Sequence, residues 1–156
     1  MDEAQAEPLA AMADGSFTKA RMLANDTWQH QRNWIIRAAG LDTPGALRTR
    51  PLTLALAFSA QLALNKEKVQ EHLDMLKTWI RDLSIFRHQP SRIINRDRKD
   101  LIDAVRSDMD ESQLLDMWES IEKAQKAIAA RANLRLTLDI MVLRMAGLTD
   151  VQPGKN

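Results

Sequence analysis

The stretch VQEHLDMLKTWIRDLSIF, residues 69–86, carries the clearest periodic pattern of apolar residues in the chain. Its apolar residues recur at steps of four and three positions, at Val69, Leu73, Leu76, Ile80 and Leu83. A second apolar row lies beside the first and contains Met75, Trp79 and Phe86. This spacing is typical of an amphipathic helix, and the second row indicates that the helix packs against neighbours on more than one side.

The preceding stretch LTLALAFSAQLAL, residues 52–64, is compatible with two structures. Alternation of large apolar residues favours a strand, at Leu52, Leu54, Leu56 and Phe58. The intervening Ala55 and Ala57 favour a helix, and Pro51 suits the first turn of one. Because thirteen residues is also long for a strand, we expect a helix that is buried on most sides.

Turn and capping residues divide the rest of the chain. Towards the N-terminus we expect a short helix over residues 2–13, a helix capped by Ser16, a helix that contains Trp28 and ends at Gly40, and a turn that starts at Thr43-Pro44. Towards the C-terminus we expect helices that start at Asp97, Asp110 and Asn133, and a disordered tail over residues 151–156. The sequence therefore predicts an all-α protein, a compact bundle of about six helices.

Composition excludes several classes of protein. The 156 residues carry 22 Lys+Arg against 21 Asp+Glu, a formal charge of +1 that gives no global reason to bind nucleic acid or membrane. The absence of cysteine excludes disulfides, zinc ribbons and thiol catalysis. The longest nearly apolar run, residues 52–64, is shorter than the roughly 20 residues that a membrane span needs. With an acidic N-terminus that does not resemble a signal peptide, these features lead us to expect a cytoplasmic protein.

No set of residues points to catalysis or to a cofactor. Gly40 and Gly45 have the spacing of a phosphate-binding loop, but the lysine that should follow is missing. The three histidines do not pair at a metal-binding spacing, and Asp108 and Asp110 lack the ligand ladder of a calcium loop. We therefore expect no enzymatic activity, no cofactor and no metal in this chain.

One segment is locally basic. It contains Arg87, His88, Arg92, Arg96, Arg98 and Lys99. The last four residues are candidates for contacts with a DNA backbone. The alternative is a basic loop that simply faces solvent, and the acidic residues that follow, beginning with Asp100, weaken any attraction for DNA.

Two constellations are candidates for a subunit interface. The first is WIRD, residues 79–82, in which Trp79 is an anchor and the Arg81 and Asp82 side chains can pair with a neighbouring helix or subunit. The second is NLRLTLD, residues 133–139, in which Asn133 caps a helix and Arg135 and Asp139 lie one turn apart. Met141 and Met145 are further candidate anchors on this last helix. Pairing within the chain is the alternative for both constellations.

In this order, these motifs resemble the C-terminal collar domain of bacterial clamp-loader subunits, most closely the delta-prime subunit of DNA polymerase III. Ile94-Asn95 is similar to the short loop of that family after its long helix, and Asp139 stands where glutamate is usual. GSFTKA, residues 15–20, resembles the end of the preceding lid domain, where Gly15, Ser16 and Lys19 form a degenerate nucleotide-sensor motif and Lys19 replaces an arginine.

The resemblance implies a domain organisation and a role. Residues 1–24 are expected to be the tail of a lid domain, residues 25–150 a helical collar, and a nucleotide-binding fold is expected upstream. The implied role is oligomerisation without catalysis, in a five-membered loader that places the sliding clamp on primed DNA. The implied partners are the delta and gamma/tau subunits through the collar, with the clamp and primer–template DNA bound by the N-terminal part. A gamma/tau collar and a helical nucleic-acid-binding module remain the alternatives.

Overall fold

The computed structural model describes residues 26–147, and every regular element in that range is helical. The helices are α3 (Asp26–Ala38), α4 (Ala46–Thr49), α5 (Leu52–Leu64), α6 (Val69–Ile85), α7 (Lys99–Arg106), α8 (Glu111–Ala129) and α9 (Leu134–Met145), with 3-10 turns η1 (Pro90–Arg92) and η2 (Arg96–Arg98). Six of these helices are at least two turns long, and no strand occurs between residues 26 and 147. The all-α prediction is confirmed, including the helix over residues 52–64. The expectation that this helix is buried on most sides is wrong, because Leu52, Leu54 and Leu64 are exposed. The elements expected at residues 2–13, 15–20 and 151–156 lie outside the described residues.

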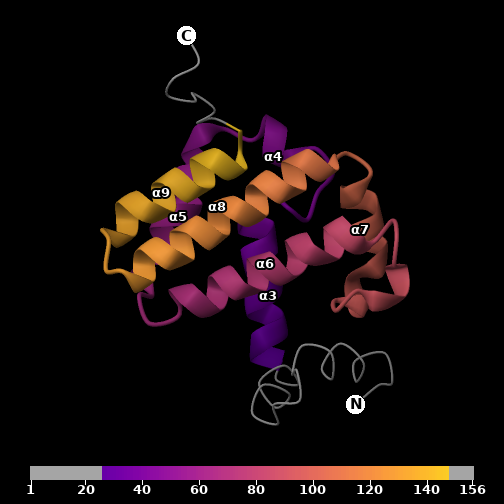
Figure 1. Cartoon of the computed structure of the whole chain (residues 1–156), viewed down its shortest axis with the longest axis horizontal. Coiled ribbons are helices and arrows are strands. Elements are labelled where there is room, and N and C mark those ends of the chain that lie inside the picture. The colour runs from indigo at the N-terminus through magenta and orange to yellow at the C-terminus, as the bar shows by residue number, and fades with distance from the viewer. Residues whose placement is uncertain (1–25, 148–156) are drawn as a thin grey trace.

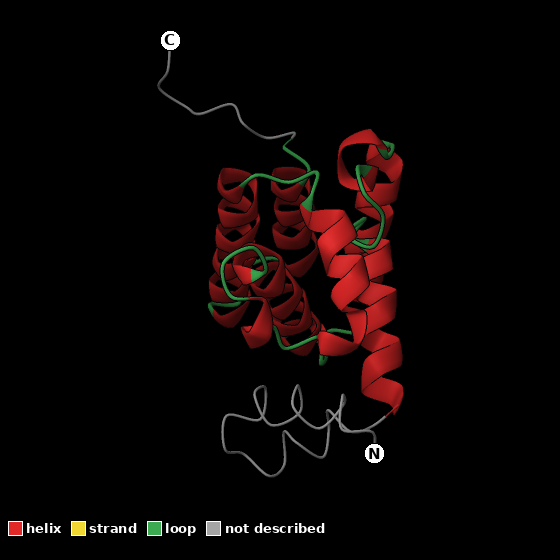
Figure 2. Cartoon of the chain, turned by 90° about the vertical axis from the view of Figure 1, so that its right-hand side faces the viewer, coloured by secondary structure: helices red, strands yellow, loops and turns green. Residues whose placement is uncertain are grey.

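Helix α6 has neighbours on more than one side, as its two apolar rows predict. It packs against α3, α5, α7 and α8. Figure 1 shows α9, α8 and α6 side by side, with α5 behind α9 and α3 behind α6. The view turned by 90° shows the same helices joined by loops (Figure 2).

One apolar core joins the helices. The side chains of Ile35, Leu62, Leu76, Ile121 and Leu138 come from α3, α5, α6, α8 and α9 and are all fully buried in it. Removal of this apolar surface from water is the main driving force that holds the bundle together.

Three predicted helix ends are confirmed. Gly40 follows α3 with a φ of 77°, and the amides of Gly40 and Leu41 donate to the carbonyls of Arg37 and Ile36, which is the hydrogen-bond pattern of a Schellman motif. The Asp110 carboxylate caps α8 by accepting from the amide of Gln113 at 2.7 Å.

The cap of α9 has the same form. The Asn133 side-chain oxygen accepts from the amide of Leu136 at 2.9 Å. Each cap satisfies an amide that would otherwise lack an intrahelical partner.

The expected turn at Thr43-Pro44 is present, because the amide of Ala46 donates to the carbonyl of Thr43 at 3.2 Å, but the expected capping role of Thr43 is wrong. Helix α4 begins at Ala46, after Gly45 in the left-handed region, and the Thr43 hydroxyl donates to Asp42 at 3.2 Å instead of capping the helix. A single turn of four residues contributes little stability of its own, so neighbouring packing sets its position.

Candidate functional site

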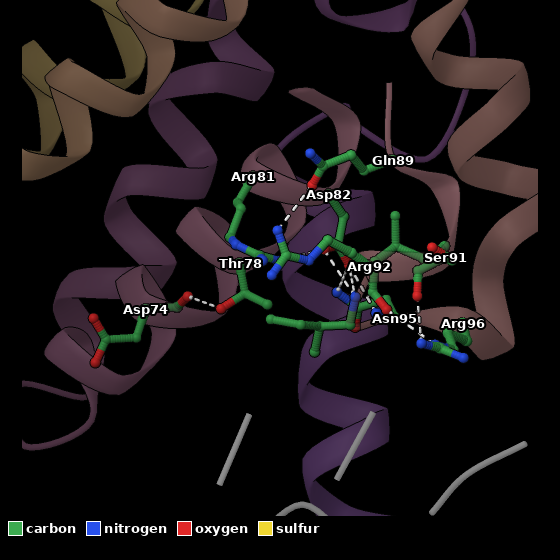
Figure 3. Close-up of polar contacts among 11 residues, drawn as sticks. Asp74, Thr78, Arg81, Asp82, Gln89, Ser91, Arg92, Asn95 and Arg96 are labelled. Carbon is green, nitrogen blue, oxygen red and sulfur yellow. Dashed lines mark hydrogen bonds and ion pairs between the residues drawn. The ribbon is translucent and has the colours of Figure 1, made fainter. Parts of the chain in front are cut away.

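The buried carboxylate of Asp82 fixes the loop that follows α6. It accepts hydrogen bonds from the amide of Ile94 at 2.9 Å, the amide of Asn95 at 2.7 Å and the side-chain amide of Asn95 at 2.8 Å (Figure 3). Burial raises the pKa of Asp82, whereas the hydrogen bonds from Asn95 and Ile94 and the charge of Arg81 oppose that rise. The WIRD and Ile94-Asn95 motifs are therefore joined by hydrogen bonds within the chain, and we call this hydrogen-bonded network the lock.

Arg32 extends this lock to α3. Its guanidinium donates to the Asn95 side chain at 3.1 Å and makes two bonds to the Asp97 carboxylate, at 2.9 and 2.6 Å. The guanidinium carbon of Arg32 lies 5.4 Å from the centroid of the Trp28 ring. The prediction that Asp97 caps a helix is wrong, because α7 begins at Lys99 without a side-chain cap and Asp97 pairs with Arg32 instead.

The four candidate DNA contacts lie on this fixed loop or at the first residue of α7. Arg92 and Arg96 extend in opposite directions in Figure 3, and Arg92 donates to the side chain of Gln89 at 3.1 Å. Arg96 donates to the carbonyl oxygens of Ile93 and Ser91. Arg98 is half-buried and Lys99 is exposed. The hydrogen bonds of Arg92 and Arg96 hold these two side chains against the loop.

The second constellation also pairs within the chain. Arg135 lies 3.0 Å from Asp139 on the same face of α9, and Asp139 accepts a hydrogen bond from the hydroxyl of Ser59 on α5. Because Ser59 is fully buried, the carboxylate joins α9 to α5 at the boundary of the core.

Three candidate interface anchors belong to the core of this chain. Trp79 is 0% exposed, and its indole nitrogen donates to the carbonyl of Leu41 at 3.1 Å. Met141 and Met145 are also buried. The assignment of these three residues, and of the buried Asp82, to a subunit interface is therefore corrected: periodicity shows that a row is apolar but not whether its own chain covers it. Arg81, Asn133, Arg135 and Asp139 remain accessible.

A subunit interface needs apolar side chains that are exposed in the free chain, and α5 and α9 carry such side chains. Leu52 and Leu64 on α5 are 48% and 85% exposed, and Leu136 and Ile140 on the adjacent α9 are 59% and 39% exposed. We name these four residues the α5/α9 face. Helix α5 contains no charged residue from Leu52 to Leu64, and apart from Thr53 and Gln61 its exposed residues are apolar, which favours contact with another protein.

A separate groove lies between α3 and α5, with α4 beside it. Its volume is about 410 Å³, and its lining includes Trp34, Arg37, Arg50, Leu54 and Phe58. The sequence did not predict this groove or the role of Arg32, because both depend on residues that are distant in the chain and meet only after folding.

The described part of the chain offers no metal centre and no membrane anchor. Between residues 26 and 147, no three His, Cys, Asp or Glu side chains gather as they would around a metal ion. None of the helices in the same range is both long enough and apolar enough to cross a membrane.

Comparison with known proteins defines the class to which this bundle belongs. Residues 47–146, from α4 to α9, match the family described as DNA polymerase III, delta subunit, C terminal. The match covers more than half of the chain, so the protein belongs to this family. No curated protein matches the chain, and no solved structure matches it.

Proposed function

We propose that this chain is the oligomerisation domain, or collar, of a DNA polymerase III clamp-loader subunit. The family match supports a place in the clamp loader. The α5/α9 face carries the proposal, because four large apolar side chains on two adjacent helices are exposed in the free chain. Their burial against another subunit would contribute favourable free energy to assembly at about 25 cal/mol per Å² of apolar surface.

Within this assembly we propose delta-prime as the particular subunit. WIRD, Ile94-Asn95 and NLRLTLD support this narrower assignment, and Lys19 in place of a sensing arginine agrees with a subunit that does not use ATP. A gamma/tau collar is the alternative within the same assembly. The complete reading frame distinguishes the two: delta-prime predicts an upstream nucleotide-binding fold with a degraded phosphate loop, and gamma/tau predicts an intact one.

The proposed partners are the delta and gamma/tau subunits, which meet the chain through the collar in the cytoplasm. Arg81, Asn133, Arg135 and Asp139 are accessible and can set the register of the contact, whereas the apolar face supplies most of its energy. Contacts with the sliding clamp and with primer–template DNA are assigned to the N-terminal part of the subunit. The role assigned to this chain is assembly, without catalysis.

The test compares two surface variants in co-purification with the other loader subunits. Leu136→Ser combined with Ile140→Ser removes half of the α5/α9 face, and Leu115→Ser on α8 is the matched control because Leu115 is 56% exposed. We expect the double variant to lose partner binding with an unchanged melting temperature, and the control to bind normally. Equal binding by both variants would reject the α5/α9 face as the contact.

Binding of the basic loop to DNA is a second candidate function. The observation that favours it is that the Asp82–Asn95–Arg32 lock fixes the loop that carries Arg92 and Arg98 and that leads into Lys99 at the start of α7. Contacts with a phosphate backbone predict an affinity of the isolated chain for DNA that falls steeply with salt. An affinity that Lys99→Gln and Arg92→Gln leave unchanged would reject this function.

A further inference from the structure

The groove between α3 and α5 has an apolar floor. The ring of Trp34 meets Phe58 edge to face, with 6.4 Å between the ring centroids. Leu54 and Ala57 line the groove beside them and are exposed. Such a floor accepts a side chain of the size of leucine or phenylalanine.

Two arginines give the rim of this groove a positive charge. Arg37 is 79% exposed, and Asp42, the acidic residue of the lining, lies 3.6 Å from it. Arg50 donates to the carbonyl of Ala38 at the end of α3, while its buried Nε has no hydrogen-bond partner. The lining residues thus contain two guanidinium groups and one carboxylate, and the excess positive charge favours binding of a second carboxylate.

The position of Arg50 is fixed by the backbone beneath it. Gly40 has a φ of 77°, and a Cβ atom at this position would lie 3.3 Å from Cδ of Arg50. The arginine therefore packs directly on the turn after α3 and is held at the groove. A donor that is already held in place loses little side-chain entropy when it binds a ligand.

We propose that this groove binds a peptide segment of a partner protein in which an acidic residue lies close to a leucine or phenylalanine. The apolar side chain packs against Trp34, Leu54 and Phe58, and the carboxylate pairs with Arg37 and Arg50. The proposal is independent of the collar, because the groove shares no residue with the α5/α9 face and its α3 wall lies outside residues 47–146, the part that matches the family.

The test starts with selection of a random twelve-residue peptide library on the whole 156-residue chain. We expect the enriched peptides to combine Asp or Glu with Leu or Phe. Their binding is then followed by ¹⁹F NMR of the chain labelled with fluorotryptophan, in which Trp34→Phe identifies the Trp34 signal. A saturable shift of the Trp34 signal is expected, whereas the fully buried Trp79 keeps its signal.

Charge reversal separates groove binding from general attraction to a basic protein. Arg37→Glu is expected to weaken peptide binding by about tenfold or more, and Arg144→Glu, an equally sized change at an exposed site on α9, is expected to leave it unchanged. The proposal is overturned by failure of the library to enrich any peptide, by enriched peptides without an acidic residue, or by equal effects of the two variants. The Arg37→Glu and Arg144→Glu variants should still bind the other loader subunits, because neither residue belongs to the α5/α9 face. Failure of the groove proposal therefore leaves the collar proposal intact.

Discussion

Replacement of Asp82 by asparagine tests the lock between α6 and the following loop. The change preserves the shape of the side chain but replaces one carboxylate oxygen by an NH₂ group, which cannot accept a hydrogen bond. An NH₂ group in place of Oδ1 would face the amide of Ile94, which now donates to that oxygen at 2.9 Å. An NH₂ group in place of Oδ2 would face the backbone and side-chain amides of Asn95, which now donate to that oxygen at 2.7 and 2.8 Å. In either orientation a donor meets a donor and at least one of the present hydrogen bonds is lost.

The magnitude follows from the number of bonds that are lost. A hydrogen bond to a charged group contributes roughly 1.5–3 kcal/mol, and a buried donor left without a partner costs about 1–3 kcal/mol. We therefore expect Asp82→Asn to lower the free energy of unfolding by about 2–5 kcal/mol. Urea unfolding followed by circular dichroism measures this change, and hydrogen exchange at Ile94 and Asn95 should accelerate.

Asp74→Asn is the matched control for this experiment. Asp74 lies on the same helix and accepts a hydrogen bond from Gln125 at 2.8 Å, but it is exposed. We expect its substitution to change the free energy of unfolding by less than about 0.5 kcal/mol. If Asp82→Asn is as mild as this control, the buried carboxylate does not hold the loop and the reasoning fails.

Three further substitutions test other parts of the account. Trp79→Ala should lower the free energy of unfolding by about 3–5 kcal/mol in thermal or urea unfolding, because it leaves a cavity in the core. A stable variant that only fails to assemble would show instead that Trp79 acts at the subunit interface. Burial lowers the pKa of His72, with the neighbouring Glu71 opposing that shift and Lys68 adding to it. The folded state therefore resists protonation of His72, so the free energy of unfolding should fall as the pH drops below the ordinary histidine range. Thermal melts from about pH 7.5 to about pH 5 should show a smaller pH dependence for His72→Gln, and an equal pH dependence of the two proteins would contradict this prediction. Asp110→Ala should cost about 0.5–2 kcal/mol through loss of the α8 cap in urea unfolding, and no change would mean that the cap is dispensable.

Local signals in the sequence predicted the helices well. The alanines of residues 52–64 outweighed the alternation of leucines, and Asp110 and Asn133 cap the helices that they were expected to cap. These features succeed because each depends on interactions within a few residues along the chain.

Long-range contacts explain what the sequence did not predict. Asp97 has the chemistry of a cap, but Arg32, which is 65 residues away, binds it. Trp79 and Met141 were assigned to an interface because their rows are apolar, and only the packing of α6, α8 and α9 shows that the chain covers them itself. The exposed face of α5 and α9 likewise becomes visible only when the bundle is assembled.

Hydroxyl-radical footprinting of the assembled loader shows whether the α5/α9 face is the subunit contact, since it reports the solvent accessibility of individual side chains. The oxidation rates of Leu64 and Leu136, which are 85% and 59% exposed in the free chain, should fall severalfold when the partner subunits bind, while that of Leu115 stays constant. Unchanged oxidation of Leu64 and Leu136 in a fully formed assembly would contradict the proposal that α5 and α9 form the collar contact.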